Sequence, residues 1–497
     1  MTRFLPSFLL CASVPLWLVP STARAQDKPA PIPDTISYYK DVRPIFVLHC
    51  QGCHQPAKPQ GGFVMTSHAD LLKKGDSDTP GVVPAKPQES KVISQITPDK
   101  DGKAAMPKSK DPLGGREREV ITKWIAQGAK DDTPMSAKHV VDADHPPVYP
   151  QLPVVSSVDF SPDGKLLAVS GYHEVLLHKA DGSGLVGRLV GLSERVQSLA
   201  FSPDGKQLAV AGGSPGRFGE IQVWDVDKKK LKVSQTFTFD TLYGVSWSPD
   251  GSKIAFGCAD NTVRAVDAQN GKQVMFQGAH SDWVMGTAFS QTGEYVISVS
   301  RDRSAKMTEV STQRFIDNIT SITPGALKGG ILAVARRPRN EKEKRMSKVP
   351  PDTPGGKPLP YDEVLLAGSD GVPKIYKIHR EAKRVIGDDF NKVKAFDAMP
   401  GRIYAGCWNK DGTLFAVGTS FEDNNQAKGE ARVYKVEDGK VVSTFEGIKS
   451  PVYTMAYAPD GKSVAVAGFD GMVRLHDPAT GKLIKEFAPA PVTTASR

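Results

Sequence analysis

The stretch Cys50-Gln51-Gly52-Cys53-His54 holds the residues whose types and spacing most clearly indicate chemistry. Two thiols that flank two residues and are followed at once by an imidazole match the arrangement that attaches haem covalently. Each cysteine can form a thioether to the porphyrin, and His54 is then held under the iron as an axial ligand. A redox disulfide would be expected beside a βαβ pattern, and zinc would need a second ligand pair nearby; neither is present. The sequence therefore predicts one covalent haem c on Cys50 and Cys53.

A second axial ligand is expected after the attachment site, where the chain offers Met65, Met106 and His68. Met106 is preferred because it precedes Pro107 in a Gly- and Lys-rich loop, residues 101–113, which is long enough to cross the far face of the haem. A thioether ligand favours ferrous iron and raises the reduction potential, as suits an electron carrier. The alternatives are an empty sixth position or ligation by histidine.

Helices are expected to position these residues. Apolar residues recur at helical spacing before, between and after the candidate ligands, which predicts helices over Tyr38–His49, Ser67–Lys74, Gln88–Thr97 and Arg116–Gln127. The last is the strongest, because its apolar residues form one stripe and Gly128 follows as a natural stop. It is expected to pack on the first helix and to form one side of the haem site. Residues 36–130 are thus predicted to form a small all-α domain.

This region resembles the planctomycete-type cytochrome c domain over about a hundred residues. The resemblance rests on segments in the family's order: Val42-Arg43-Pro44-Ile45, Cys50-Gln51-Gly52-Cys53-His54, Gly61-Gly62, Lys74-Gly75, Val83-Pro84, Glu89-Ser90, Met106-Pro107 and Trp124-Ile125-Ala126-Gln127-Gly128-Ala129. It implies His54 and Met106 as iron ligands, and Cys50 and Cys53 as attachment points. The sequence departs from the family at Lys108, where a second proline commonly follows the Met-Pro pair.

The chain's start predicts export. Residues 1–25 read as a secretory signal, with Arg3, a mostly apolar run and the small-x-small cleavage site Ala23-Arg24-Ala25. The expected location of the mature protein is therefore the periplasm. No later segment reaches the roughly 20 consecutive apolar residues of a membrane span. The formal net charge of +9 is spread along 497 residues without an aromatic-interleaved basic stripe, so it predicts solvation rather than a nucleic-acid partner.

From about residue 153 to 490, apolar-alternating runs are separated by Asp-Gly turns at a period in the forties. The turn Ser161-Pro162-Asp163-Gly164 recurs at 202–205, 248–251, 290–293, 409–412 and 458–461. Four strands per period of 40–45 residues are typical of a propeller blade. Counting a divergent copy between Gly325 and Ile386, the sequence predicts an all-β propeller with seven blades.

The repeats resemble WD-repeat β-propellers. Ile221-Gln222-Val223-Trp224-Asp225 carries the namesake dipeptide, and Gly278-Ala279-His280 lies roughly where the family's glycine-histidine pair is found. Residues 131–152, rich in proline, are predicted to be a semi-extended linker. Residues 336–360, basic and then proline-rich, are predicted to be an insertion in one blade. Cys258 and Cys407 are expected to be small buried hydrophobes in strands.

Three functions remain in view. The leading prediction is an exported electron-transfer protein, a carrier rather than a catalyst, whose propeller docks partner proteins; a redox partner is implied, but not its identity. The first alternative is an oxidoreductase whose propeller binds a substrate or second cofactor. It requires His, Arg or carboxylates converging on the propeller axis, and the histidines at 173, 178, 280, 379 and 476 are scattered. The second alternative is a redox-sensing interaction scaffold.

Overall fold

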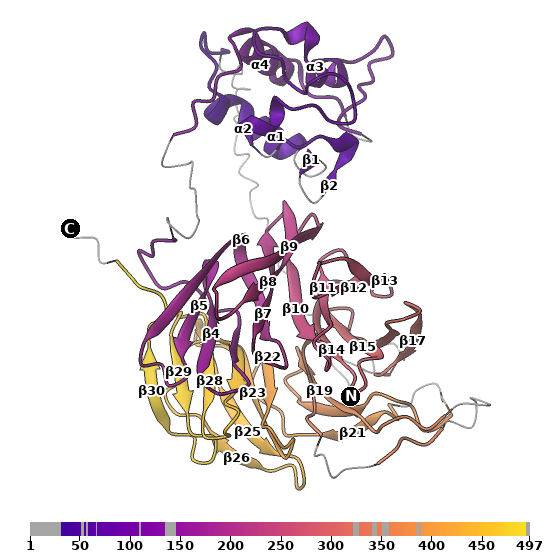
Figure 1. Ribbon diagram of the computed structural model, residues 1–497, viewed down its shortest axis with the longest axis vertical. Coiled ribbons are helices and arrows are strands. Elements are labelled where there is room, and N and C mark those ends of the chain that lie inside the picture. The colour runs from indigo at the N-terminus through magenta and orange to yellow at the C-terminus, as the bar shows by residue number, and fades with distance from the viewer. Residues whose placement is uncertain are drawn as a thin grey trace, which may run out of the picture.

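The computed structural model of this protein contains one unit built mainly of helices and one built of antiparallel sheets (Figure 1). Each unit has its own hydrophobic core. The structure describes residues 31–50, 54–55, 58–65, 67–108, 111–134, 146–321, 328–339, 345–349, 357–383, 385 and 389–493. The predicted signal peptide and half of the predicted linker, residues 135–145, lie outside the described residues.

The helical unit has short elements. In chain order they are η1 (Tyr38–Val42), α1 (Arg43–His49), β1 (His54–Gln55), β2 (Lys58–Pro59), η2 (Gln60–Gly62), α2 (His68–Leu71), η3 (Pro87–Glu89), α3 (Lys91–Ile96) and α4 (Gly115–Ala126). The first expected helix is divided into a π-helical turn and α1, and Pro44 lies in the first turn of α1, where its missing N–H costs no hydrogen bond. The paired β1 and β2 correct the expectation of a purely helical domain.

Two helices are shorter than expected. α2 ends at Leu71 because the Leu71 carbonyl accepts a hydrogen bond from the backbone N–H of Val82 at 2.8 Å, which draws the following chain away from the helix. α3 ends before Thr97, which is extended with φ −81° and ψ 123°. Thr97 precedes Pro98, and a residue before proline is disfavoured in the helical region.

Trp124 of α4 is the centre of the helical core. Its ring stacks on Tyr38 with 5.2 Å between centroids and meets Phe46 of α1 edge to face at 6.4 Å. Both Phe46 and Trp124 are fully buried. The last helix therefore packs on the first, as the sequence predicted.

The rest of the described chain is mostly β, in four-stranded and larger antiparallel sheets. The first sheet contains β3 (Val158–Phe160), β4 (Leu166–Ser170), β5 (Tyr172–Lys179), β6 (Leu185–Phe201), β7 (Gln207–Ser214), β8 (Phe218–Asp225) and β9 (Lys230–Thr238). The next two contain β10 (Leu242–Trp247), β11 (Lys253–Cys258), β12 (Val263–Asp267) and β13 (Gln273–Gln277), then β14 (Val284–Phe289), β15 (Tyr295–Ser300), β16 (Ala305–Glu309) and β17 (Phe315–Asn318).

Three further sheets complete the described strands. The divergent copy forms β18 (Ile331–Arg336), β19 (Glu363–Gly368), β20 (Lys374–Lys377) and β21 (Lys392–Ala395), so its fourth strand lies beyond the expected limit at Ile386. The next contains β22 (Arg402–Trp408), β23 (Leu414–Asp423), β24 (Gln426–Lys428), β25 (Ala431–Lys435) and β26 (Val441–Thr444). The last contains β27 (Val452–Tyr457), β28 (Val464–Gly468), β29 (Val473–His476) and β30 (Leu483–Phe487).

The innermost strands of these sheets meet in a ring. Each inner strand contacts the next, in the order β3, β6, β10, β14, β18, β22 and β27, and β27 in turn contacts β3. Hydrogen bonds that close the ring between the first and last sheets include those from Val155 N to Gly468 O at 3.0 Å and from Val158 N to Thr454 Oγ1 at 2.9 Å. The last sheet takes all its strands from the C-terminal end, so packing of β27 on β3 closes the ring. This arrangement fits a β-propeller.

The Asp-Gly turns show why the repeated motif has its composition. In the first copy, Ser161 Oγ donates to Asp163 Oδ1 at 2.7 Å, and the backbone N–H of Lys165 donates to the same oxygen at 3.1 Å. Gly164 adopts φ +71°, a conformation that residues with a Cβ rarely take. The same Ser–Asp bond recurs in the second and third copies. Each turn thus closes its hairpin with its own side chains.

The C-terminal end of the predicted linker is held on the first sheet by a cluster that we call the linker latch, made of Tyr149, Glu174 and Arg188. Tyr149 Oη donates to Glu174 Oε1 at 2.7 Å, and Arg188 donates to both carboxylate oxygens at 2.6 Å. The Glu174 side chain is completely buried. Tyr149 also pairs with Val492 in a parallel bridge, so residues from the two ends of the sheet region meet here.

Candidate functional site

A cavity of about 460 Å³ lies beside the end of α1, and three of the four predicted site residues line it. Cys50 follows α1 directly, His54 lies in β1, and Met106 comes from the loop between α3 and α4. The structure therefore brings together a thiol, an imidazole and a thioether that are up to 56 residues apart in the chain. Cys53 lies outside the described residues.

The His54 ring is oriented by its own backbone surroundings. Its Nδ1 lies 3.2 Å from the carbonyl oxygen of Phe63. A carbonyl oxygen only accepts, so Nδ1 carries the proton and Nε2 keeps its lone pair. Metal-bound histidines almost always show this arrangement, in which the outer N–H binds a carbonyl or carboxylate. His54 is thus prepared to bind a metal through Nε2.

The loop that carries Met106 is bound to α3 and is also held by an internal hydrogen bond. Met106 N donates to the carbonyl oxygen of Gln95 in α3 at 2.9 Å. Earlier in the loop, the Asp99 side chain accepts a hydrogen bond from the backbone N–H of Lys103 at 2.9 Å. Pro107 is buried, whereas Met106 is half-buried and faces the cavity. The loop therefore holds a thioether at the cavity wall.

The other candidate ligands are placed differently. His68 points away from the cavity, because its Nε2 is bound to the carbonyl oxygen of Ala129 at 2.7 Å. Met65 touches the cavity but is 3% exposed and belongs to the core. His49 also lines the cavity, with its Nε2 3.0 Å from Glu117 Oε1. Of the three ligands considered from sequence, Met106 and Met65 reach the cavity and His68 does not.

The remaining lining fits a large, flat, mostly apolar group. Apolar side chains such as Phe63, Ile96 and Leu113 contribute, and the volume lies in the range of roughly 300–1,000 Å³ usual for cofactor sites. Three glycines, Gly61, Gly75 and Gly81, also line the space, and a Cβ built on Gly81 would lie 1.9 Å from the Phe63 ring. An imidazole and a methionine thioether are the axial donors of a haem c, and a cysteine thiol is an attachment point for its porphyrin. The described residues therefore fit a haem.

The described residues contain no other cluster of potential metal ligands. Within the described ranges, no group of three or more His, Cys, Asp or Glu side chains is placed to hold a metal ion. Cys258 is fully buried at the end of β11 and Cys407 is half-buried in β22. Burial raises the pKa of both thiols to about 12, so they stay protonated and behave as small hydrophobes.

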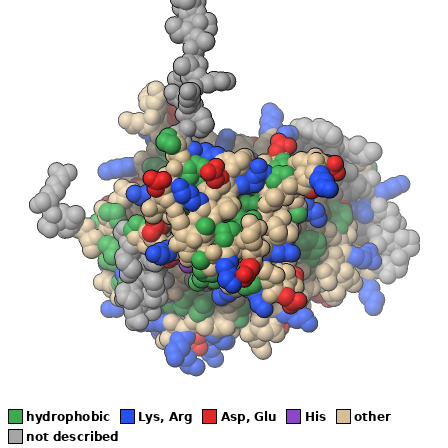
Figure 2. All heavy atoms as spheres, turned by 90° about the horizontal axis from the view of Figure 1, so that it is seen from above, with side chains coloured by type: hydrophobic (Ala, Val, Ile, Leu, Met, Phe, Trp, Pro, Cys, Tyr) green, Lys and Arg blue, Asp and Glu red, His purple; other side chains and the backbone are tan. Residues whose placement is uncertain are grey.

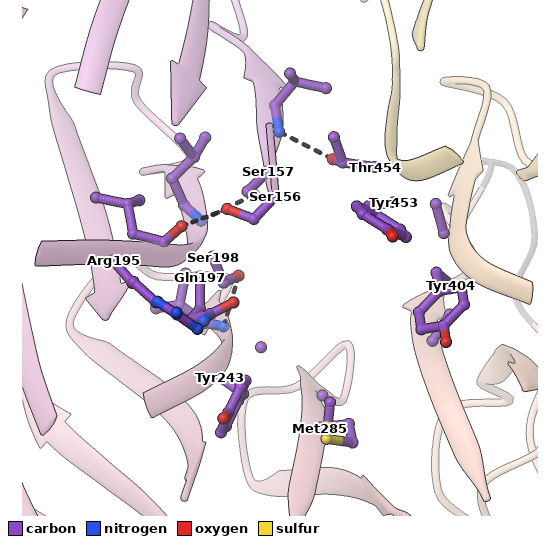
Figure 3. A pocket seen from close by; sticks show the side chains of 18 of the residues that line it. Ser156, Ser157, Arg195, Gln197, Ser198, Tyr243, Met285, Tyr404, Tyr453 and Thr454 are labelled. Carbon is purple, nitrogen blue, oxygen red and sulfur yellow. Dashed lines mark hydrogen bonds between the residues drawn. The ribbon is translucent and has the colours of Figure 1, made fainter. Parts of the chain in front are cut away.

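A second cavity, of about 770 Å³, lies on the axis of the ring of inner strands (Figure 3). Its charged lining residues are Glu194 and Arg195, and none of the propeller histidines considered from sequence lines it. His280, for example, is bound to Asp302 and Ser298 at 2.8 Å each. Sequence reasoning missed this cavity. The available signal was a recurring register position in the inner strands, where several repeats carry tyrosine.

On the face shown in Figure 2, Lys and Arg side chains are interspersed with Asp and Glu side chains rather than separated from them. The positive charge of the chain is thus mixed with negative charge on this face. No helix among the described residues has the length and apolar character needed to cross a membrane.

Family comparisons match both units. Residues 50–110 match the planctomycete cytochrome C family, and residues 150–177 and 439–477 match the WD domain, G-beta repeat. Residues 217–292 match the anaphase-promoting complex subunit 4 WD40 domain. The fold and the matches together define a cytochrome c-like domain fused to a WD-repeat protein.

Curated relatives match the chain only in part. A chromatin assembly factor 1 protein of Saccharomyces cerevisiae is 33% identical over 81 residues, 16% of this chain and 17% of the relative. Its counterpart of the same name in Gallus gallus is 26% identical over 110 residues, covering 22% and 19%. A protein of eukaryotic translation initiation factor 3 in Candida glabrata is 24% identical over 238 residues, 48% of each chain. The chain thus spans at most about half the length of these WD-repeat relatives, and the matches support a protein-interaction propeller.

Proposed function

We propose that this protein is an exported c-type cytochrome that carries one covalent haem for electron transfer, with a seven-bladed propeller as a docking platform for partner proteins. The observation that carries the proposal is the meeting of Cys50, His54 and Met106 at one largely apolar cavity. Neither a structural disulfide nor a zinc site accounts for an imidazole and a thioether beside the thiol.

Each residue has a distinct role in this proposal. His54 binds iron through Nε2, because Nδ1 is committed to the Phe63 carbonyl. Met106 supplies the thioether on the loop anchored to Gln95. Cys50 and Cys53 form the two thioether bonds. A bound haem supplies a one-electron couple, and the apolar lining, by excluding water, favours its ferrous state.

The sheet region is proposed to have seven blades. The ring of inner strands contains β3, β6, β10, β14, β18, β22 and β27, one for each blade. β6, 17 residues long, serves two blades, since its first part pairs with β5 and its last part pairs with β7. A rigid ring of this kind presents loops at both faces for partner proteins. Function is still set by the sites on a fold rather than by the fold itself.

Export and a periplasmic location follow from the sequence of residues 1–25 and remain part of the proposal. N-terminal sequencing of the mature protein from its own source tests this part separately. A first residue near Gln26 would support export, and an intact Met1 would contradict it.

The central test is the absorption spectrum of the purified full chain, oxidised and reduced, followed by extraction with acidified organic solvent. A low-spin haem that stays with the polypeptide is expected. The C50S/C53S double variant should lose it to the solvent phase, whereas C407A, which changes a thiol of the other unit, should keep it. A haem that extracts from the unaltered chain would contradict covalent attachment, and a chain purified without haem would contradict the proposal.

The axial cavity favours the oxidoreductase alternative as the second candidate. It is large enough for a small organic ligand and is lined by Arg195 and several tyrosines. A second chromophore that enters the solvent phase in the same extraction, while the haem stays, would support this alternative.

A further inference from the structure

The axial cavity is built from one repeated register position. Each inner strand ends in an aromatic residue, except β18, which ends in Arg336. The residue four positions before that end lines the cavity in every repeat, and it lies in the strand itself except in the first repeat, where Ser156 precedes β3. In the order of the ring these residues are Ser156, Gln197, Tyr243, Met285, Leu332, Tyr404 and Tyr453. Because chain order follows ring order, the last five form a continuous aromatic and apolar arc. Ser156 and Gln197 form the polar remainder.

The polar side carries one available charge. Glu194 is offset by Arg217, whose Nη1 lies 3.4 Å from Glu194 Oε1. Arg195, two residues before Gln197, is exposed, and its side chain makes no hydrogen bond or ion pair within the described part of the chain. The Gln197 amide makes none there either. Figure 3 shows Arg195 and Gln197 on one side of the open space, with Tyr404 and Tyr453 on the other.

The aromatic side is held in place by ring contacts. Tyr404 and Tyr453 meet edge to face with centroids 5.4 Å apart, and Tyr243 stacks on Trp283 at 5.8 Å. Neither Tyr404 nor Tyr453 uses its hydroxyl group in a hydrogen bond among the described residues. Burial raises the pKa of Tyr453, so its hydroxyl stays protonated and can donate. The rings are therefore positioned to contact a flat apolar surface and to donate hydrogen bonds at its edge.

We infer that the mouth of the axial cavity binds a small planar aromatic carboxylate, with its ring against Tyr404 and Tyr453 and its carboxylate on Arg195 and Gln197. A guanidinium group binds a carboxylate through two parallel hydrogen bonds, and an aromatic ring on the opposite side fills the apolar arc. The volume of about 770 Å³ accommodates a ligand of this size. A cationic ligand would be repelled by Arg195. A purely polar anion would make no contact with the aromatic and apolar arc. This site is independent of the proposed haem.

The test is titration calorimetry of the full chain with 6-hydroxy-2-naphthoate. Two comparison compounds separate the contributions: 2-naphthylmethanol has the ring without the charge, and acetate has the charge without the ring. Saturable binding of the naphthoate to one site per chain is expected, with both comparison compounds binding more weakly. Failure of the naphthoate to bind at millimolar concentration, or equal binding of the uncharged alcohol, would overturn the inference.

Variants locate the site. R195Q should weaken naphthoate binding by about three- to fivefold, the upper part of the range for an exposed charge pair. Arg402 provides the matched control, because it is exposed, lies two residues before Tyr404 just as Arg195 lies two before Gln197, and does not line the cavity. R402Q should leave the affinity within about twofold. Y453L should also weaken binding, and unchanged affinity in both R195Q and Y453L would place the ligand elsewhere and contradict the site.

Discussion

His54 Nδ1 lies 3.2 Å from the carbonyl oxygen of Phe63, and the rings of these two residues meet edge to face with 5.9 Å between centroids. The hydrogen bond sets which nitrogen carries the proton, and the ring contact limits rotation of the imidazole. Since an axial ligand must present one nitrogen in one direction, this pair accounts for how β1 presents His54.

The sixth ligand is tested by comparing two methionines that both line the cavity. M106L keeps an apolar side chain but removes the thioether, so it should convert the haem to a high-spin form and lower its reduction potential. M65L is the matched control, because Met65 is a core residue and a volume-conserving change there costs less than about 1.5 kcal/mol. Optical spectra and redox titration make the comparison. Conversion to high spin in M65L and not in M106L would assign Met65 as the ligand.

Gly75 allows a close approach of two backbone segments at the cavity. A Cβ on Gly75 would lie 2.3 Å from the Gly61 carbonyl oxygen, and a backbone atom cannot move aside as a side chain can. G75A should therefore lower the free energy of unfolding of the helical unit by about 1–3 kcal/mol and reduce haem content. G115A, in the first turn of α4, is the control, since its nearest neighbour would be 3.9 Å away. Equal stability of the two variants in urea titrations would contradict this explanation.

Two aspartates near the first repeated turn should affect stability with opposite signs. Burial raises the pKa of Asp159 to about 7, although the backbone N–H of Phe201 partly stabilises the charged form. Its folded pKa lies above the unfolded value of about 3.9, so the stability it contributes is lost as pH rises through 7. D159N should therefore increase the free energy of unfolding by roughly 1–2 kcal/mol near pH 8 and have little effect near pH 4.

Asp163 is the opposing control. Hydrogen bonds from the Ser161 hydroxyl and the Lys165 backbone lower its pKa to about 2. The stability that Asp163 contributes to the folded state is therefore present above the unfolded pKa and is lost as pH falls through about 2. D163N should decrease stability at neutral pH. Denaturant titrations across pH measure both variants, and a D159N profile parallel to that of the unaltered chain would contradict the assignment.

The linker latch should contribute to the stability of the sheet region. Substitution R188M leaves the buried Glu174 carboxylate without its cation and should lower the free energy of unfolding by about 2–4 kcal/mol. This is below the full value for a buried ion pair because the Arg188 side chain is 21% exposed. Y149F removes the hydrogen bond to Glu174 and the one that the Tyr149 hydroxyl accepts from the backbone N–H of Tyr172, and it should lower the free energy of unfolding by about 1–2 kcal/mol.

The control for the latch is R217M, which breaks the more exposed Arg217–Glu194 pair and should cost less than about 1 kcal/mol. Urea denaturation followed by far-ultraviolet circular dichroism measures all three variants. A cost for R188M no larger than that for R217M would show that the latch is not a stabilising contact.

Local patterns in the sequence were sufficient to predict the cytochrome c-like domain, the helix that became α4, and the four-strand repeats with their Asp-Gly turns. Each of these depends on residues close together in the chain: adjacent ligands, one apolar stripe, or a serine and an aspartate that close the same hairpin. Helix ends were less predictable, because the end of α2 depends on a hydrogen bond from Val82 and not only on its own residues.

Tertiary structure decided which side chains meet across the chain. The sequence offers Met65, Met106 and His68 as potential ligands and favours Met106. Their placement in the structure separates His68, bound to Ala129, from the two methionines that reach the cavity. The axial cavity and the latch also join residues from different repeats or from opposite ends of the sheet region. A repeat period predicts blades, but it does not predict which side chains of different repeats face one another, because that depends on ring closure between β3 and β27.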